Sequence, residues 1–308
     1  MAEARSGNLD AHEVYAYGVI APSALYVLSD DFPPPAGYAE IAEVHPSIGG
    51  EAAGGAYVLA RLGVATKLDG NRLGADDESA RVVAVLSAAG VDCTAIALDP
   101  HTSPVTEVVF ATPDARTVFG TYGRLSADRS WNHPAREDVL SSRIVCLDPF
   151  FGDASLQVAR WCREAAIPYV TVDTAPDSEI ARHGDVLVVS EEFASRTFGP
   201  FQPEEMLAAY TGRCEGLVIL TRGNEPLLYG RGDEPVREHT PVSVEVRDTT
   251  GAGDSFRAGI IYGMLRGYND ERLIATASAV AAFVCLSPPG VLHSPTEQEL
   301  AEFLAGHG

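Results

Sequence analysis

The stretch that most constrains this chain is residues 248–256, which read Asp-Thr-Thr-Gly-Ala-Gly-Asp-Ser-Phe. They follow an alternating β-like run at 242–246 and open a segment whose apolar residues recur at helical spacing. The two glycines in the turn let the backbone approach a ligand closely, because no Cβ stands in the way. The amides of Gly251, Ala252 and Gly253 are then expected at a helix N-terminus, where free donors and the helix dipole favour an anion.

A carboxylate, Asp254, stands directly behind this predicted anion site. An anion cradle with a base beside it suits phosphoryl transfer, in which charge neutralisation and orientation of the nucleophile are most of the work. The alternative interpretation is an ordinary glycine turn, with Asp254 as a first-turn acid that matches the helix dipole.

The run D-T-T-G-A-G-D-S-F, followed by Ala258 and Gly259, closely resembles the signature of the ribokinase/PfkB family of small-molecule kinases. The resemblance implies a ribokinase-like three-layer α/β/α fold with a mostly parallel central sheet and a small β lid. It also implies an ATP-dependent carbohydrate kinase that phosphorylates a hydroxyl of a small sugar or sugar-like acceptor. Asp254 would accept the hydroxyl proton while the amides of residues 251–253 stabilise the transferred phosphoryl group. A nucleoside (adenosine-like) kinase and a ligand-binding homologue without turnover are the alternatives.

The length of 308 residues and the 46% hydrophobic content suit a single kinase domain over 1–308 with an ample core. No apolar run is long enough to span a bilayer, and residues 1–10 are polar and lack a signal-peptide core. Five widely spaced cysteines indicate reduced thiols and a cytoplasmic protein. The net charge of −21 argues against nucleic acid or an anionic membrane as partners. A small sugar or nucleoside-like substrate is what the resemblance implies.

Strand-like and helix-like segments alternate along most of the chain, which predicts a parallel sheet covered on both faces, with ligands beyond the carboxyl ends of its strands. Segments at about 24–48 and 105–122 do not fit this alternation and predict a small projecting sheet. In the family that the chain resembles, such segments form a lid over the acceptor, and a homodimer through the lid is a further expectation. The predicted strands are 14–20, 64–68, 91–98, 144–147, 168–172, 186–189 and 217–220, and helices are expected at 57–62, from 76 or 77, at 154–166, from 203, at 270–284 and at 295–305.

Gly49 and Gly50 precede a second glycine pair and either allow tight helix–sheet packing or form an acceptor-binding turn. The resemblance implies the second role, but two residues depart from the family pattern. Ser23 stands where the family usually carries an aspartate, and Gly54 stands where it carries an asparagine. Ser23, Gly49, Gly50, Gly54 and Asp254 are therefore the predicted acceptor residues, with altered specificity. Glu51 is either an exposed loop residue or the source of the missing carboxylate.

On the nucleotide side, the resemblance implies that Thr221 and Gly223 line the base and ribose, the alternative being a simple strand-to-hairpin turn. Thr250 is predicted to contact the nucleotide as well. Ser190 and Glu192 follow a strand where many members carry N-x-x-E near the metal-bound phosphates, but that motif is absent and the local run is more similar to the ketohexokinase branch. Glu192 either organises metal-bound water or is a solvated acid at the start of a helix.

The cofactors implied are ATP and Mg²⁺, and Mg²⁺ needs few protein ligands because it keeps waters and takes phosphate oxygens. The resemblance adds a monovalent-cation site for K⁺, built from Asp248, the carbonyl of Thr250 and the loop that contains Gly290 and Ser294. Ser294 with Glu297 also fits a capping box for the last helix, and the two roles are compatible.

Overall fold

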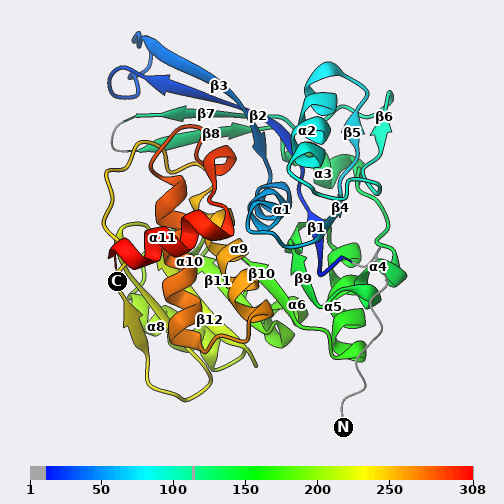
Figure 1. Ribbon diagram of the computed structural model, residues 1–308, viewed down its shortest axis with the longest axis vertical. Helices are drawn as coiled ribbons and strands as arrows, with labels where there is room; N and C mark the ends of the chain where they lie inside the picture. Colours follow the sequence, from blue (N-terminus) through cyan, green and yellow to red (C-terminus); the bar gives the residue numbers. More distant parts are fainter. Residues whose placement is uncertain (1–11, 113–114, 308) are drawn as a thin grey trace.

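The computed structural model describes residues 12–112 and 115–307. Residues 1–11, which include the polar N-terminal stretch, and Pro113 and Asp114 of the predicted hairpin turn lie outside the described residues. The chain folds around an eight-stranded sheet in the order β14-β13-β12-β11-β10-β9-β1-β4 (Figure 1). Its strands are β1 (Val14–Gly18), β4 (Thr66–Gly70), β9 (Ile144–Leu147), β10 (Tyr169–Val172), β11 (Val186–Ser190), β12 (Leu217–Arg222), β13 (Glu225–Gly230) and β14 (Arg237–His239).

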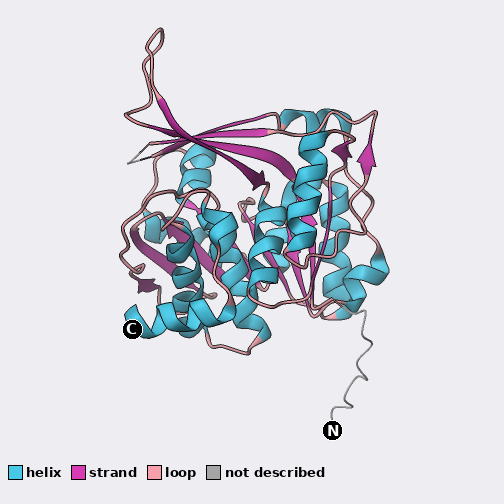
Figure 2. Cartoon of the chain, turned by 45° about the horizontal axis from the view of Figure 1, so that its top comes forward, coloured by secondary structure: helices cyan, strands magenta, loops and turns pink. Residues whose placement is uncertain are grey.

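All neighbours from β4 to β12 are parallel, and β13 and β14 extend the sheet in antiparallel fashion at one edge. Helices cover both faces of the sheet (Figure 2). The predicted three-layer α/β/α fold with a mostly parallel sheet is therefore confirmed. The helices are α1 (Glu51–Arg61), α2 (Asp77–Ala88), α3 (Gly123–Asp128), α4 (Arg136–Ser141), α5 (Asp153–Ala165), α6 (Glu179–His183), α7 (Glu191–Phe198), α8 (Pro203–Thr211), α9 (Ala252–Leu265), α10 (Asp270–Val284) and α11 (Glu297–His307), with short 3₁₀ turns at Pro149–Phe151 and Gly290–His293.

The central strands are apolar throughout because both of their faces are buried. In β1, Val14 and Ala16 pack into the core beneath α1, α9 and α10, whereas Tyr15 and Tyr17 face the core beneath α5. This alternation follows from the two-residue period of a strand. Helices α9 and α10 approach so closely that a Cβ on Gly259 would stand 2.6 Å from the Cα of Ala277. The glycine that ends the sequence motif is thus required for helix packing.

The second sheet, in the order β3-β2-β7-β8, lies across one end of the molecule (Figure 1). Its strands are β2 (Ala21–Leu28), β3 (Ile41–Gly49), β7 (Glu107–Ala111) and β8 (Arg116–Gly120), and a separate two-stranded ladder joins β5 (Leu73–Gly74) to β6 (Leu98–Asp99). Two residues separate the end of β1 from the start of β2, so this sheet continues from the carboxyl edge of the central sheet. We call the four strands the lid. They coincide with the segments that were expected to project.

Three local expectations were wrong. The first helix begins at Glu51 and not near Tyr57, because Gly54 and Gly55 lie inside it, packed against α9. Residues 91–98 are mostly not a strand, since the Asp92 carboxylate accepts bonds from the amide and hydroxyl of Thr94 and turns the chain. The run 242–246 is not a strand either, because β13 and β14 take the sheet edge and no described strand pairs with it.

The cap of the last helix was also misassigned. The amide and hydroxyl of Thr296 both donate to Glu299 at 2.7 Å, and the Glu299 amide donates back to the Thr296 hydroxyl at 3.3 Å. Ser294 instead ends the preceding 3₁₀ turn, and Glu297 accepts from Tyr262. The capping box therefore lies two residues later than expected, which leaves the Ser294 hydroxyl unused by the cap.

Candidate active site

The predicted anion cradle lies at the N-terminus of α9. Gly251 caps the helix with φ of +78°, a left-handed conformation that favours glycine. The Ala252 amide already donates to the Thr249 carbonyl at 3.2 Å. Within the part of the chain that the structure describes, no backbone acceptor takes the amides of Gly251 or Gly253. Two of the three expected donors are thus available to an anion.

Asp254 lies in the first turn of α9 and faces α1. A Cβ built on Gly54 would stand 3.1 Å from Oδ2 of Asp254 and 3.2 Å from its Cβ. Burial raises the pKa of Asp254 to about 7, the nearby charge of Arg257 opposes that rise, and the carboxylates of Asp148 and Glu107 add to it. The structure therefore brings Gly54 and Asp254 together and gives the acid a pKa in the range of a general base.

Glu51 opens α1 beside the same carboxylate. Its Oε2 is buried and has no hydrogen-bond partner among the described residues. Burial raises the pKa of Glu51 to about 8, and the charges of Asp148 and Asp254 contribute. Of the two interpretations of Glu51, the exposed loop residue is ruled out, because Glu51 is a partly buried residue at the start of α1.

A buried ion pair behind these acids escaped the reasoning from sequence. Arg257 and Asp148 are both fully buried, with Nη1 of the arginine 2.5 Å from Oδ1 of the aspartate. Oδ2 of Asp148 accepts from the amides of Val19 at 2.8 Å and Ala52 at 3.1 Å, so it joins β1 to the start of α1. The only cationic residue of a mostly apolar helix, and an aspartate directly after an apolar strand, were the available signals.

The hydrogen bond between Ser23 and Glu107 is a second interaction that the sequence did not predict. The Ser23 hydroxyl donates to Oε1 of Glu107 on β7 at 2.8 Å, and the Tyr122 hydroxyl donates to Oε2 of the same carboxylate. Gly49 lies against this group, since a Cβ there would stand 2.9 Å from Glu107 Oε1. Three predicted acceptor residues, Ser23, Gly49 and Gly54, thus lie around carboxyl groups from other elements.

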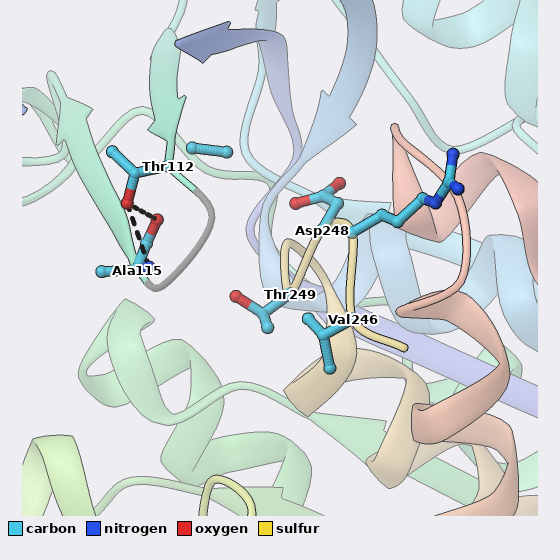
Figure 3. Close-up of a pocket in the computed structure, with 7 residues that line it drawn as sticks. Thr112, Ala115, Val246, Asp248 and Thr249 are labelled. Carbon is cyan, nitrogen blue, oxygen red and sulfur yellow. Dashed lines mark hydrogen bonds between the residues drawn. The ribbon is translucent and has the colours of Figure 1, made fainter. Parts of the chain in front are cut away.

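The lid reaches the cradle through Arg116. Its Nη1 donates to the carbonyl of Thr249 at 3.0 Å and to the hydroxyl of Thr249 at 3.2 Å. Figure 3 shows a pocket of about 40 Å³ in which Thr249 faces the end of the β7–β8 hairpin at Thr112 and Ala115. Arg116 of lid strand β8 is therefore in direct contact with Thr249, which lies just before the cradle.

The predicted nucleotide residues meet at the carboxyl ends of neighbouring strands. Ser190 of β11 pairs in register with Thr221 of β12. Ser190 also caps α7, and its amide and hydroxyl donate hydrogen bonds of 2.8 and 2.9 Å to the carboxylate of Asp173. Asp173 is a partly buried acid that the sequence did not reveal. The Glu192 side chain is 77% exposed. Gly223 follows in the β12–β13 turn with φ of +61°.

The predicted cation site joins the motif to the loop before α11. Asp248 is buried, and its carboxylate accepts from the Thr250 amide at 2.8 Å and the Gly290 amide at 2.9 Å. The Ser294 hydroxyl is fully buried, with no hydrogen-bond partner in the described part of the chain. The carbonyls of Val284 and Thr250 approach Gly290, lying 2.7 and 3.0 Å from where its Cβ would be. The described residues contain no group of three or more His, Cys, Asp or Glu side chains that could hold a metal.

A larger cavity of about 410 Å³ lies between the segment after β14 and helices α10 and α11. Ala275, Ala279, Phe303 and Leu304 contribute apolar walls, and His239 and His307 contribute polar groups. Its volume is in the range of small-molecule sites. The chain segment that lines it continues directly into the cradle.

The fold and the site together define a class of α/β enzyme with a ligand site between a lid and the carboxyl edge of the sheet. Solved structures share this architecture. The ribokinase of Arabidopsis thaliana, complexed with ribose and ATP, matches with a TM-score of 0.78, 21% identity and coverage of 96% of this chain and 99% of that one. The nucleoside kinase of Burkholderia thailandensis, complexed with inosine, matches with a TM-score of 0.77, 18% identity and coverage of 96% and 97%.

The sequence matches the family described as "pfkB family carbohydrate kinase" over residues 12–297, and the chain belongs to that family. The ribokinase of Bacillus subtilis is 26% identical over 286 residues, which cover 91% of this chain and 95% of the relative. The ATP-dependent 6-phosphofructokinase of Thermoanaerobacterium thermosaccharolyticum is 37% identical over 99 residues, 32% of this chain and 30% of that protein. The matched segments span less than half of this relative and of the Arabidopsis thaliana ribokinase found by sequence.

Proposed function

We propose that this chain is an ATP-dependent kinase that phosphorylates a hydroxyl of a small sugar or sugar-like acceptor. The observation that carries the proposal is the placement of the Asp254 carboxyl group beside the unpartnered amides of Gly251 and Gly253. A base and an anion cradle on adjacent residues are what transfer of a phosphoryl group to a hydroxyl requires.

In the proposed reaction the acceptor oxygen attacks the γ-phosphorus of ATP and the bond to the β–γ bridging oxygen breaks. Asp254 accepts the proton of the hydroxyl, and ADP leaves with the bridging oxygen. The amides of Gly251 and Gly253 stabilise the charge on the phosphoryl oxygens, aided by the dipole of α9. A pKa of Asp254 near 7 leaves a large ionised fraction at neutral pH while keeping the group basic enough to take a proton.

We further infer where ATP lies along the carboxyl edge. From the cradle, ATP would extend past Ser190, Thr221 and Gly223 at the ends of β11 and β12. Thr250 lies in the turn that forms the cradle and would contact ATP there. The cavity of about 410 Å³ beside Ala275 offers apolar walls of the size that a nucleotide base needs. Glu192 is too exposed to bind ATP directly and would reach phosphate-bound metal only through water.

The residues present fit the two proposed cations in different ways. The buried hydroxyl of Ser294, with the carbonyls of Thr250 and the Gly290 loop and the nearby carboxylate of Asp248, offers the oxygen ligands that K⁺ takes. A K⁺ there would order the turn that leads to the cradle. Mg²⁺ would supply charge neutralisation of the phosphates, with ligands mostly from ATP and water.

Two experiments test the proposal. The first is a coupled assay of ATP turnover against a panel of sugars and nucleosides, and turnover on none of them would contradict it. The second is Asp254→Asn, which keeps the shape and removes the base, and it should lower kcat by about 10²–10⁴-fold with the thermal unfolding profile preserved. Near-normal turnover would reduce Asp254 to a first-turn helix residue.

A nucleoside acceptor is the second candidate. The structural similarity to a nucleoside kinase supports this candidate as to fold. The same panel decides between the two.

Two further features complete the proposal. Phe119 of β8 and Phe32 of the β2–β3 loop are exposed and stack with their ring centroids 6.3 Å apart, and we propose that the lid of a second copy covers them. Sedimentation analysis of Phe119→Asp should then show a monomer where the unmodified chain is a dimer.

Five free cysteines, four of them buried, support a location in the reducing cytoplasm.

A further inference from the structure

The acceptor pocket contains a carboxylate where the sequence indicated that one was missing. Ser23 and Glu107 are direct neighbours in the parallel register of β2 and β7. The Ser23 hydroxyl donates to Oε1 of Glu107 at 2.8 Å, and the Tyr122 hydroxyl donates to Oε2. A carboxylate that would be attached to β2 in an aspartate-bearing relative is here attached to the adjacent strand.

Space and charge both place Glu107 within the acceptor pocket. Gly49 leaves room for the carboxylate, since any Cβ at that position would crowd Oε1 at 2.9 Å. The negative charge of Glu107 also contributes to the raised pKa of Asp254, so the two acids lie near each other. A carboxylate accepts about four hydrogen bonds, and Ser23 and Tyr122 take one each. Two acceptor sites of Glu107 are therefore left for a ligand.

We propose that Glu107 is the specificity-determining carboxylate of this kinase and binds two hydroxyls of a neutral polyhydroxyl acceptor. Ser23 and Tyr122 are then positioning residues that hold the carboxylate in place. The assignment rests on the proposed function, since it names a substrate-binding group for that reaction.

The surrounding charges favour the same acceptor class. The other acids near this space are Asp254, Glu51 and Asp148. Among the described residues, three cations are nearby and engaged: Arg257 by Asp148, Arg116 by Thr249, and Arg81 by Glu78 and by the carbonyls of Ser23 and Ser47. An acceptor that carries a carboxylate or a phosphate would meet like charges, whereas hydroxyls would meet unfilled acceptor sites. Sugar acids and sugar phosphates should therefore be poor acceptors compared with the parent neutral sugars.

The first test is the steady-state kinetics of Glu107→Gln, which keeps the shape and removes the charge. The variant should lose roughly 10- to 100-fold in kcat/KM for the acceptor, the value of hydrogen bonds to a charged group, while KM for ATP stays unchanged. Glu43→Gln is the matched control, because Glu43 is an exposed glutamate on lid strand β3 that pairs only with His45. Equal effects on ATP and acceptor, or no effect on either, would overturn the assignment.

The second test moves the carboxylate back to β2. Ser23→Asp alone places two carboxylates within hydrogen-bond distance and should impair acceptor binding, as should Glu107→Ser alone. The double variant Ser23→Asp/Glu107→Ser restores one carboxylate with a hydroxyl partner and should recover at least tenfold over either single variant in acceptor kcat/KM. If Glu107 serves lid folding alone, acceptor kcat/KM should fall and recover in step with Tm across the three variants. The proposal requires this loss and recovery at unchanged Tm, and absence of recovery would also refute it.

Failure of the two proposals can be told apart. Absence of turnover by the unmodified chain on every acceptor overturns the kinase function and the Glu107 assignment with it. Turnover by the unmodified chain together with unaltered Glu107→Gln kinetics overturns the assignment alone.

Discussion

The buried pair of Arg257 and Asp148 allows one perturbation with two separate readouts. Arg257→Met keeps the length of the side chain and removes its charge. Asp148 is then left fully buried without its cationic partner, although the amides of Val19 and Ala52 still donate to Oδ2. Breaking a buried pair costs about 3–5 kcal/mol, and the two remaining bonds place the loss at the low end, about 3 kcal/mol. At about 2–4 °C per kcal/mol in mid-sized chains, Tm should fall by roughly 6–12 °C.

The same variant should shift the pH dependence of the reaction. The positive charge of Arg257 opposes the rise in the pKa of Asp254, so its removal raises that pKa further above about 7. Because kcat/KM requires ionised Asp254, it increases with pH through this pKa, and the acid limb of the profile should move to higher pH in Arg257→Met.

The double variant Arg257→Met/Asp148→Asn is the control for both readouts. The asparagine carbonyl oxygen can still accept the two amides, and no unpaired charge remains, so most of the lost stability should return. Removing the aspartate charge also moves the acid limb back towards its original position, because that charge raises the pKa of Asp254. Urea unfolding and a pH series of kcat/KM measure the two effects. If the single variant lost less than about 1 kcal/mol, or the double variant were no more stable than the single, the reasoning from the buried pair would be refuted.

Three further predictions concern the rest of the site. Gly54→Ala should lower kcat by about 10²-fold, because the new Cβ would displace Asp254. Gly55→Ala is the control and should leave kcat nearly unchanged, because its Cβ would have ordinary contacts at 3.7 Å. Similar rates for the two variants would contradict this packing argument. Ser294→Ala should abolish any difference between rates in K⁺ and in a large organic cation, and equal rates in the unmodified chain would remove the K⁺ proposal. Ala275→Phe should raise KM for ATP and leave KM for the acceptor unchanged, and an unchanged KM for ATP would place the base elsewhere.

Much of the fold follows from local sequence patterns. The apolar runs at β9 to β12 are buried on both faces, and their alternation with helices predicts the parallel sheet. The start of α1 could not be predicted in this way, because Gly54 and Gly55 favour a turn by propensity and are helical only because α9 packs against them. Tertiary packing overrides local preference at that point.

The site residues likewise fall into two groups, those that a local sequence pattern predicts and those that only tertiary packing brings together. The cradle and Asp254 are contiguous in the chain, so a motif of a few residues is sufficient to predict them. Glu107 is brought to Ser23 by the register of two strands that lie 84 residues apart, and no local pattern specifies that register. Arg257 and Asp148 meet across 109 residues by the packing of α9 on β9. Chemistry that depends on such pairings becomes visible only in the folded chain.

The placement of α9 against α1 has a consequence for synthesis of the chain. α1 and β1 are made within the first 61 residues, but the helices that cover them, α9 and α10, begin only at residue 252. A nascent chain that emerges N-terminus first therefore exposes the apolar face of β1 and the glycine face of α1 until α9 and α10 have left the ribosome. Polypeptides terminated before residue 252 should accordingly be retained by chaperones, whereas chains that include α9 and α10 should be released.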